Sequence, residues 1–373
     1  MDMSARMLAA ATVLAVAGVV AGSGASAAAP ADRPGTVTAV HALPPEAWIP
    51  GAASGRVLTY RTLGPQDRPA SSTGAVFLPP GQPPPGGWPV ISWAHGAVGV
   101  ADGCAPTVTG KIGGPYLGRW LAQGYAIVAT DYVGLGTEGV HPYLDGRSEA
   151  HAVVDMVRAA RAVEPSLSDR WVTLGQSQGG QAAMVTATLA TAYAPELDHR
   201  GTVALGVPSN IENLAPLGGP WFPPLPLTGT TVFIAYVIAG LRASHPDLDV
   251  DAYLSERGKR VVAQAEQLCY EEAAAAFGDT SIGALFARGL DEPILRPLRE
   301  MLAIPLRGYD RPLFLGQGLL DTIVPAPLTL KLVADLVGAG QRFTFRTYPR
   351  GHLETMLASE AEASDFVRAV FGP

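Results

Sequence analysis

One stretch decides the fold: Trp171-Val-Thr-Leu-Gly175-Gln-Ser177-Gln-Gly179-Gly180. Its first four residues favour a strand, and the alanine-rich segment 178–193 that follows favours a helix. A Gly-x-Ser-x-Gly pattern between a strand and a helix is typical of a sharp turn that lifts the serine hydroxyl above the edge of a sheet. We therefore interpret Ser177 as a nucleophile at a helix N-terminus. The alternative is a glycine-rich turn that carries an inert serine.

Apolar strands alternate with helices on both sides of this stretch. Strand patterns cover residues 56–63, 74–78, 89–94, 125–130, 171–174, 203–207, 312–315 and 342–348. Helix patterns cover residues 116–123, 149–163, 178–193, 327–337 and 360–371. Because the strands lack polar alternation and are separated by helices, we expect an α/β fold with a mostly parallel sheet and helices on both faces.

The alternation breaks between residues 207 and 306. This part is first rich in proline and then helical, with helix patterns over 230–242, 250–256 and 259–277. We expect a helical cap over the carboxyl edge of the sheet. The chain would then consist of a core of residues 30–207 and 307–373, interrupted by a cap insertion of residues 208–306.

A serine hydroxyl needs a base to become nucleophilic at neutral pH, and the base needs an acid to orient it. In sheets of this kind the acid and then the histidine follow the serine along the chain. Asp321 comes just past the apolar strand 312–315, and His352 comes just past the strand 342–348. We therefore predict that Ser177, His352 and Asp321 form a catalytic triad. The alternatives are a turn aspartate and a surface-loop histidine.

Acyl transfer also requires hydrogen-bond donors for the negative oxygen of the tetrahedral intermediate. One donor is expected to be the backbone N–H of Gln178, which follows the nucleophile. The other should come from the loop after the strand 89–94, where we favour the N–H of Ala97 over those of Gly96 and Val98. The alternative is that this loop is only a turn that ends the strand.

The other chemically active residues fit structural roles better. Asp131 follows the strand 125–130 in a loop with glycines, where we expect it to bind backbone N–H groups rather than to catalyse. Six further histidines are weaker candidates for the base, because they lie in loops, in a helix or too early in the chain: His41, His95, His141, His151, His199 and His245. No His-x-x-x-His or Cys-x-x-Cys spacing occurs, so we expect neither a metal site nor a cofactor.

The composition limits the class of protein and its partners. The 373 residues are 48% hydrophobic and 16% charged, which excludes a disordered chain. Two cysteines are too few for a disulfide-rich scaffold. The net charge is −7, whereas nucleic-acid binding requires a basic surface, so nucleic acid is not an expected partner.

Residues 1–29 have the pattern of a secretory signal peptide. Arg6 precedes the apolar run 8–20, which is too short to cross a bilayer comfortably, and Ala25-Ser26-Ala27 fits a cleavage site near residues 27–29. We therefore expect a secreted, extracellular protein without a stable membrane anchor. The alternative is an N-terminal anchor. Export would place Cys104 and Cys269 in an oxidising compartment where they can pair; otherwise they are two buried free thiols.

Together these motifs resemble the secretory lipase family, the α/β-hydrolases of actinobacteria and fungi that include the fungal lipase A type. The resemblance covers nearly all of the chain after residue 29. It rests on residues 175–180, on Ser92-Trp-Ala-His-Gly96, on Asp131-Tyr-Val-Gly-Leu-Gly136, on His141-Pro-Tyr-Leu144 and on Gly351-His352.

The resemblance implies an α/β-hydrolase fold with a helical lid, secretion, and hydrolysis of carboxylic esters, with Ser177, Asp321 and His352 at the family's triad positions. It also implies a disulfide between Cys104 and Cys269 that ties the oxyanion loop to the lid. Gln176 departs from the family, in which histidine or tyrosine is frequent before the serine. This departure leaves the substrate preference open.

The expected function is that of a lipase or esterase on small-molecule or lipid esters of the acylglycerol type, with a transient contact to a lipid interface. The rival functions are acyl transfer or peptide hydrolysis on the same triad, and a catalytically silent hydrolase fold that serves as a binding protein. The apolar side chains of the cap either line an acyl channel or form the cap's own core. They include Trp221, Phe222, Leu225, Leu227 and the helix 230–241.

Overall fold

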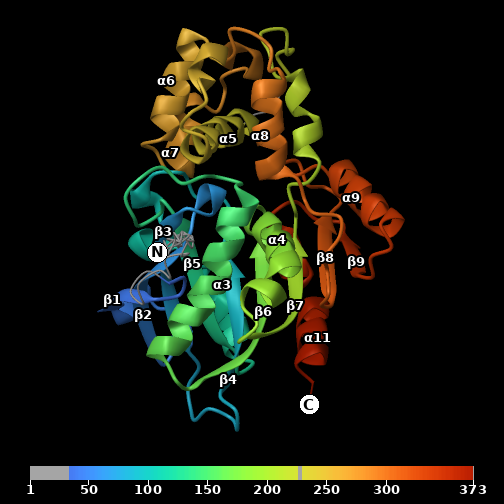
Figure 1. Cartoon of the computed structure of the whole chain (residues 1–373). Coiled ribbons are helices and arrows are strands. Elements are labelled where there is room, and N and C mark those ends of the chain that lie inside the picture. Colours follow the sequence, from blue (N-terminus) through green and yellow to red (C-terminus); the bar gives the residue numbers. More distant parts are fainter. Residues whose placement is uncertain (1–32, 226–228, 373) are drawn as a thin grey trace, which may run out of the picture.

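The computed structural model describes residues 33–225 and 229–372, so the expected signal peptide of residues 1–29 lies outside the described residues. Strands of the described part form one sheet with nine strands in the order β1-β2-β3-β5-β4-β6-β7-β8-β9 (Figure 1). Their bounds are β1 Val37–Ala42, β2 Ser54–Leu63, β3 Pro69–Leu78, β4 Trp88–Ala94, β5 Ala126–Val133, β6 Leu167–Gln176, β7 Asp198–Leu205, β8 Leu313–Gly318 and β9 Thr344–Tyr348.

The direction of the strands divides the sheet into two parts. From β5 through β4, β6, β7 and β8 to β9, each strand runs parallel to its neighbours in this part. At the other edge, β1, β2 and β3 are antiparallel, and β3 also pairs antiparallel with β5. The sheet is therefore mostly parallel, which confirms the predicted fold class.

Helices cover both faces of the sheet. On one face α3, α4 and α9 pack against the strands, and on the other face α2 and α11 do so. The largest side chains of these layers are fully buried: Trp171 faces α3 and α4, and Trp120 of α2 faces the other side. The core helices are α1 Pro106–Thr109, α2 Gly114–Leu121, α3 Gly146–Val163, α4 Gln178–Tyr193, α9 Ala326–Gly338, α10 Glu354–Ala358 and α11 Glu360–Phe371.

The register of the parallel strands brings their carboxyl ends to one edge. Ala94 at the end of β4 pairs with Gly175, Gln176 pairs with Leu205, and Leu205 pairs with Gly316. Residues that directly follow these strands therefore meet at the same edge, which is where open α/β sheets place their ligand sites.

The segment after β7 lies above this carboxyl edge as a helical cap (Figure 1). It contains α5 Thr230–Ser244, α6 Glu256–Ala265, α7 Tyr270–Phe277 and α8 Glu292–Leu302. The cap helices share an apolar cluster that is separate from the clusters of the sheet, although Val100, Tyr143 and Leu144 of the core join it. The division of the chain at residues 208 and 306 stays a prediction.

Three elements differ from the sequence pattern. The helix expected over 259–277 is wrong, because the chain leaves the helical path between α6 and α7, where Cys269 has extended backbone angles. Helix α8 has no counterpart among the predicted helices; it contains Pro293 and Pro297, and Pro293 stands in the first turn, where its missing N–H costs nothing. Strand β1 is a mostly exposed edge strand without an apolar pattern.

Candidate active site

Ser177 occupies a strained turn between β6 and α4. Its backbone angles are φ 58° and ψ −123°, which a residue with a side chain adopts only where the surroundings enforce it. The two flanking glycines explain how the turn closes: a Cβ on Gly175 would lie 1.9 Å from the carbonyl oxygen of Gly179, and a Cβ on Gly179 would lie 1.8 Å from that of Ala94. The turn brings the serine to the carboxyl edge of the sheet, as the motif predicts.

Asp321 and His352 meet at the same edge. His352 Nδ1 lies 2.6 Å from Asp321 Oδ2, and both side chains are buried. The other carboxylate oxygen accepts the backbone N–H groups of Ile323 at 2.9 Å and Val324 at 2.8 Å. Because an ionised carboxylate can only accept hydrogen bonds, the proton of the imidazole belongs on Nδ1, which leaves the lone pair on Nε2.

His352 and Ser177 contact the same dipeptide. The N–H of Ser177 donates to the carbonyl of Leu205 at 2.8 Å, and the ring of His352 lies against Gly206. A Cβ on Gly206 would stand 3.1 Å from His352 Cε1. His352 Nε2 is buried and has no hydrogen-bond partner among the described residues, and no hydrogen bond joins it to Ser177. Nε2 is therefore free to accept a proton at this site.

Two residues near this pair were missed by sequence reasoning. Gly206 has no side chain and so leaves room for the imidazole ring of His352. Gln317 is fully buried next to Asp321. The amide nitrogen of Gln317 donates to Asp321 Oδ2 at 3.3 Å, and its oxygen accepts the hydroxyl of Thr329 at 2.8 Å. The signal for Gln317 is a polar residue at the end of an apolar strand.

The expected oxyanion donors lie at the N-terminus of α4 and after β4. The backbone N–H groups of Gln178 and Ala97 have no acceptor among the described residues, which leaves both available to a ligand. The N–H groups of the alternatives Gly96 and Val98 likewise have no acceptor there, so hydrogen bonding does not distinguish Ala97 from them, and the choice of Ala97 stays a prediction. Ala97 is half-buried between the sheet and the cap.

Asp131 and His95 are buried next to each other at the start of this loop, where His95 Nε2 lies 3.3 Å from the carbonyl oxygen of Asp131. Asp131 accepts the N–H of Thr107 at 3.1 Å, as expected, and also the hydroxyls of Thr107 and Thr73. Burial raises the pKa of Asp131 to about 6. Burial lowers the pKa of His95 to about 4, so its ring is neutral at pH 7. Neither side chain lines the cavity described next.

A cavity of about 310 Å³ lies between the sheet edge and the cap, with Ser177 in its wall. Helix α5 lines it from the cap side, together with Phe222, Tyr253 and Phe286, and none of the described lining residues is charged. Of the two roles expected for the apolar side chains of the cap, Phe222 therefore has the first: it lines a cavity. Trp221 and Leu225 do not line the cavity and are exposed, while Leu227 lies outside the described residues.

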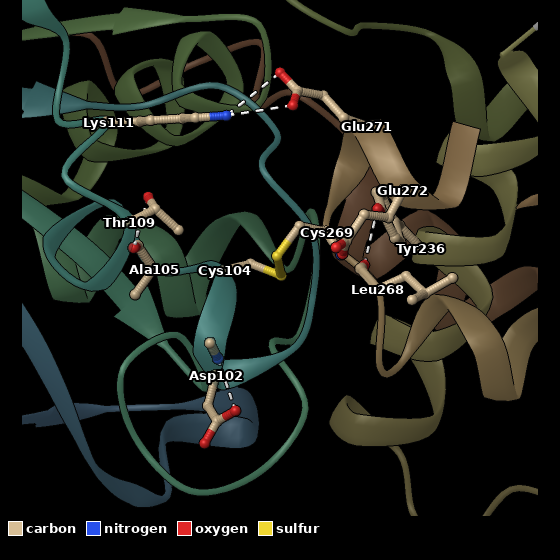
Figure 2. The surroundings of a disulfide bond; sticks show 11 residues. Asp102, Cys104, Ala105, Thr109, Lys111, Tyr236, Leu268, Cys269, Glu271 and Glu272 are labelled. Carbon is tan, nitrogen blue, oxygen red and sulfur yellow. Dashed lines mark hydrogen bonds and ion pairs between the residues drawn. A yellow bond between two sulfur atoms is a disulfide. The ribbon is translucent and has the colours of Figure 1, made fainter. Parts of the chain in front are cut away.

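A disulfide joins Cys104, which follows β4, to Cys269 of the cap, with their Cα atoms 5.4 Å apart (Figure 2). The same contact continues along the backbone: Gly99 pairs with Cys269 in an isolated β-bridge, and the N–H of Tyr270 donates to the carbonyl of Val98 at 2.9 Å. These ties explain why the chain is extended between α6 and α7.

Residues 33–225 and 229–372 contain neither a cluster of metal ligands nor a membrane-spanning helix. No group of three or more His, Cys, Asp or Glu side chains there could hold a metal ion. No helix in that part of the chain is both long and apolar enough to cross a membrane.

Known proteins are similar to this chain in sequence and in fold. A family model of secretory lipases matches residues 104–371. Lipase A of Moesziomyces aphidis is 26% identical over 346 aligned residues, which cover 84% of this chain and 71% of that protein. A probable inactive lipase of Mycobacterium tuberculosis is 25% identical over 300 residues, with 76% of this chain and 62% of that protein covered.

The structure of Candida antarctica lipase A in its closed state is similar to this fold, with a TM-score of 0.74, 22% identity, and coverage of 91% of this chain and 82% of that one. The family match spans more than half of the chain. The chain therefore belongs to the secretory lipase family and is a carboxylic ester hydrolase with the α/β-hydrolase fold.

Proposed function

We propose that the chain is a secreted serine hydrolase that cleaves acylglycerol-type carboxylic esters through Ser177, His352 and Asp321. One arrangement carries the proposal: a strained serine in the wall of an apolar cavity, and a histidine that lies against the same Leu205–Gly206 dipeptide as the serine and whose Nδ1 is bonded to a buried carboxylate. The family accounts for ester hydrolysis, and the residues and the covalent intermediate are our assignment.

In the first half of the reaction, His352 Nε2 takes the hydroxyl proton of Ser177 while Oγ attacks the ester carbonyl carbon. The carbonyl electron pair moves to the oxygen, which accepts hydrogen bonds from the N–H groups of Gln178 and Ala97. The alcohol then leaves with the proton from His352, and the acyl group stays on Ser177 as an ester.

In the second half, water attacks the acyl-enzyme and gives a proton to His352. The acid leaves as the proton returns to Ser177 Oγ. Asp321 keeps Nδ1 protonated in both halves and stabilises the imidazolium. Activity should decrease toward acid pH, because only the neutral imidazole accepts a proton.

The cavity favours an acyl chain as the group bound beside Ser177. Its described lining is mostly aliphatic and aromatic and contains no charged residue, so it offers an ionic side chain of a peptide no counter-ion. A fatty acyl chain that enters this cavity is removed from water, and this burial stabilises the bound chain by about 0.8 kcal/mol for each CH₂ group. This supports a lipase or esterase over a peptidase.

Exposed leucines surround the loops that carry the acid and the base. Leu319 and Leu320 precede Asp321, and Leu353 follows His352; each is at least half exposed. An exposed apolar rim suits a transient contact with a lipid surface, which fits a secreted enzyme of this family. The acidic chain gives no support for nucleic acid as a partner.

Fluorophosphonate labelling and ester turnover test the proposal together. Ser177→Ala should abolish labelling and reduce kcat for para-nitrophenyl esters by at least about 10⁴-fold. The control is Ser168→Ala, at the opposite end of β6, which should label and turn over like the parent chain. A Ser177→Ala protein that keeps most of its rate would refute the assignment.

The rival functions are separated by the substrates. A chain-length series of esters, below and above their solubility limits, should be hydrolysed, and peptide amides should not. Faster transfer to an added alcohol than to water would indicate an acyltransferase. A folded parent chain that neither labels nor turns over any ester would indicate a silent binding protein.

A further inference from the structure

Three buried polar side chains form a group directly behind the proposed nucleophile. They are Gln178 of α4, His141 of the loop after β5, and Glu149 of α3, and each is at most 1% exposed. The amide nitrogen of Gln178 lies 2.6 Å from His141 Nε2 and 2.7 Å from Glu149 Oε1. None of the proposed reaction steps uses His141 or Glu149.

The hydrogen bonds fix the orientation of the Gln178 amide. His141 Nδ1 lies 2.8 Å from the carbonyl oxygen of Val133, so Nδ1 carries a proton and donates, and in the Nδ1–H tautomer Nε2 is an acceptor. Both acceptors, Nε2 and the Glu149 carboxylate, then face the two hydrogens of the Gln178 amide nitrogen. Glu149 Oε1 also accepts the N–H of Leu144 at 3.0 Å, which ties the group to the cavity wall.

His141 also holds the loop that carries the second donor. The backbone N–H of His141 donates to the backbone carbonyl of Val100 at 2.9 Å. Its ring stacks on Tyr132 at 5.6 Å between centroids, and the hydroxyl of Tyr132 donates to the carbonyl of His95 at 3.1 Å. The bonds at His95 and Val100 lie on either side of Ala97.

We propose that His141 and Glu149 are positioning residues for the oxyanion hole, which hold the backbone N–H groups of Gln178 and Ala97 in place from behind. The inference rests on the proposed function, in which these two N–H groups receive the oxyanion. Such donors act only within about 2.7–3.1 Å of the oxyanion, and the loss of one reduces kcat about 10²- to 10³-fold. Neither His141 nor Glu149 lines the cavity, so both act through their neighbours.

His141→Leu is the main test, on the full chain with a soluble para-nitrophenyl ester. We expect kcat to fall about 10- to 100-fold with little change in KM, because the donors are misplaced rather than removed. Affinity for a trifluoromethyl ketone, whose adduct with Ser177 carries an oxyanion, should fall by the same factor. Affinity for the corresponding methyl ketone should hardly change.

The matched control is His199→Leu. His199 is as deeply buried and also packs against an aromatic ring, that of Trp171 at 4.5 Å between centroids, but it lies at the far end of β7. It should lose stability without losing kcat. Glu149→Gln keeps an oxygen that accepts from Gln178 and Leu144, so it should retain most of kcat, whereas Glu149→Leu should not.

Gln178→Ala keeps the backbone N–H and removes only the anchored side chain, so it tests the same link if His141→Leu does not fold. Gln178→Ala should show the same loss of kcat as His141→Leu. The double variant that combines these two substitutions should lose no more kcat than either single variant. Unchanged kcat and ketone affinity in folded His141→Leu, or in Gln178→Ala, would overturn the inference. Those results leave the proposed function intact, because that function fails only if Ser177→Ala stays active or the parent chain is inert.

Discussion

The sheet and the cap differ in what they bury. The carboxyl edge of the sheet buries ionisable side chains with their partners, such as Asp321 with His352, and Glu149 with Gln178. The cap lines the cavity with uncharged, mostly apolar side chains, among them Phe222 and Phe286. The difference indicates that bond cleavage depends on the sheet and that the choice of substrate depends on the cap.

Asp321→Asn should give the largest effect, and it acts on the sheet alone. An asparagine favours the wrong imidazole tautomer, so kcat should fall about 10⁴-fold. The order of preference within a chain-length series of esters should stay the same, because the cap is unchanged. Asp335→Asn on α9, whose carboxylate pairs with Lys331 at 2.7 Å, is the control. A changed chain-length preference in Asp321→Asn would contradict the assignment of bond cleavage to the sheet and of substrate choice to the cap.

Removal of the disulfide tests how the two regions are joined. The bond closes a loop of 165 residues between sheet and cap, so Cys104→Ser with Cys269→Ser should lower the free energy of unfolding by up to about 5 kcal/mol. Urea unfolding under oxidising conditions measures this, and reduction of the parent chain should reproduce the shift. A parent and a variant with the same unfolding midpoint would contradict the expectation.

Acid should destabilise the sheet through its buried histidines. Burial lowers the pKa of His199 to about 4, whereas the unfolded value is about 6.5. Between these values the unfolded chain binds a proton that the folded chain does not, so the stability falls as the pH decreases from 6.5 to 4. The parent chain should lose about 3 kcal/mol more than His199→Leu over this range.

Urea unfolding at pH 7 and pH 4 provides that comparison. His41→Leu is the control, because His41 lies exposed on β1. The difference between parent and variant is the useful quantity, since burial raises the pKa of Asp131 and Asp155 to about 6 and these groups act with the opposite sign. Equal acid loss in the parent and in His199→Leu would refute the prediction.

A larger side chain in the cap should give the smallest effect, on selectivity alone. Val237 of α5 lines the cavity, so Val237→Phe should reduce kcat/KM for long-chain esters about 10-fold relative to short-chain esters. Fluorophosphonate labelling should continue at a similar rate. Val337→Phe, at an exposed position of α9, is the control. An equal loss for all chain lengths would show that the cap takes part in catalysis.

The same contrast explains what could be predicted from the sequence. The predicted strands 89–94, 125–130 and 171–174 correspond to β4, most of β5 and the buried second half of β6, and α4 and α11 have the predicted bounds, because these patterns depend on local sequence. In the cap, the chain leaves the predicted helix at Cys269, since contacts with the distant residues 98–104 decide its path there.

The site shows the same limit. Asp321 and His352 could be placed because each comes a few residues past a predicted strand, and the structure brings the two together. The sequence pattern places His141 and His199 in loops, but both side chains are buried, and His199 lies in β7. Their surroundings come from Gln178, Tyr132 and Trp171, which no local pattern connects to them.

The uncharged lining of the cavity also bears on how a turnover ends. Hydrolysis converts a neutral ester into a free acid, which ionises at neutral pH. None of the described lining residues is a lysine or arginine, so the new anion finds no counter-ion and is poorly solvated there. The wall that attracts the neutral substrate thereby expels the charged product, which predicts weak product inhibition by fatty acids.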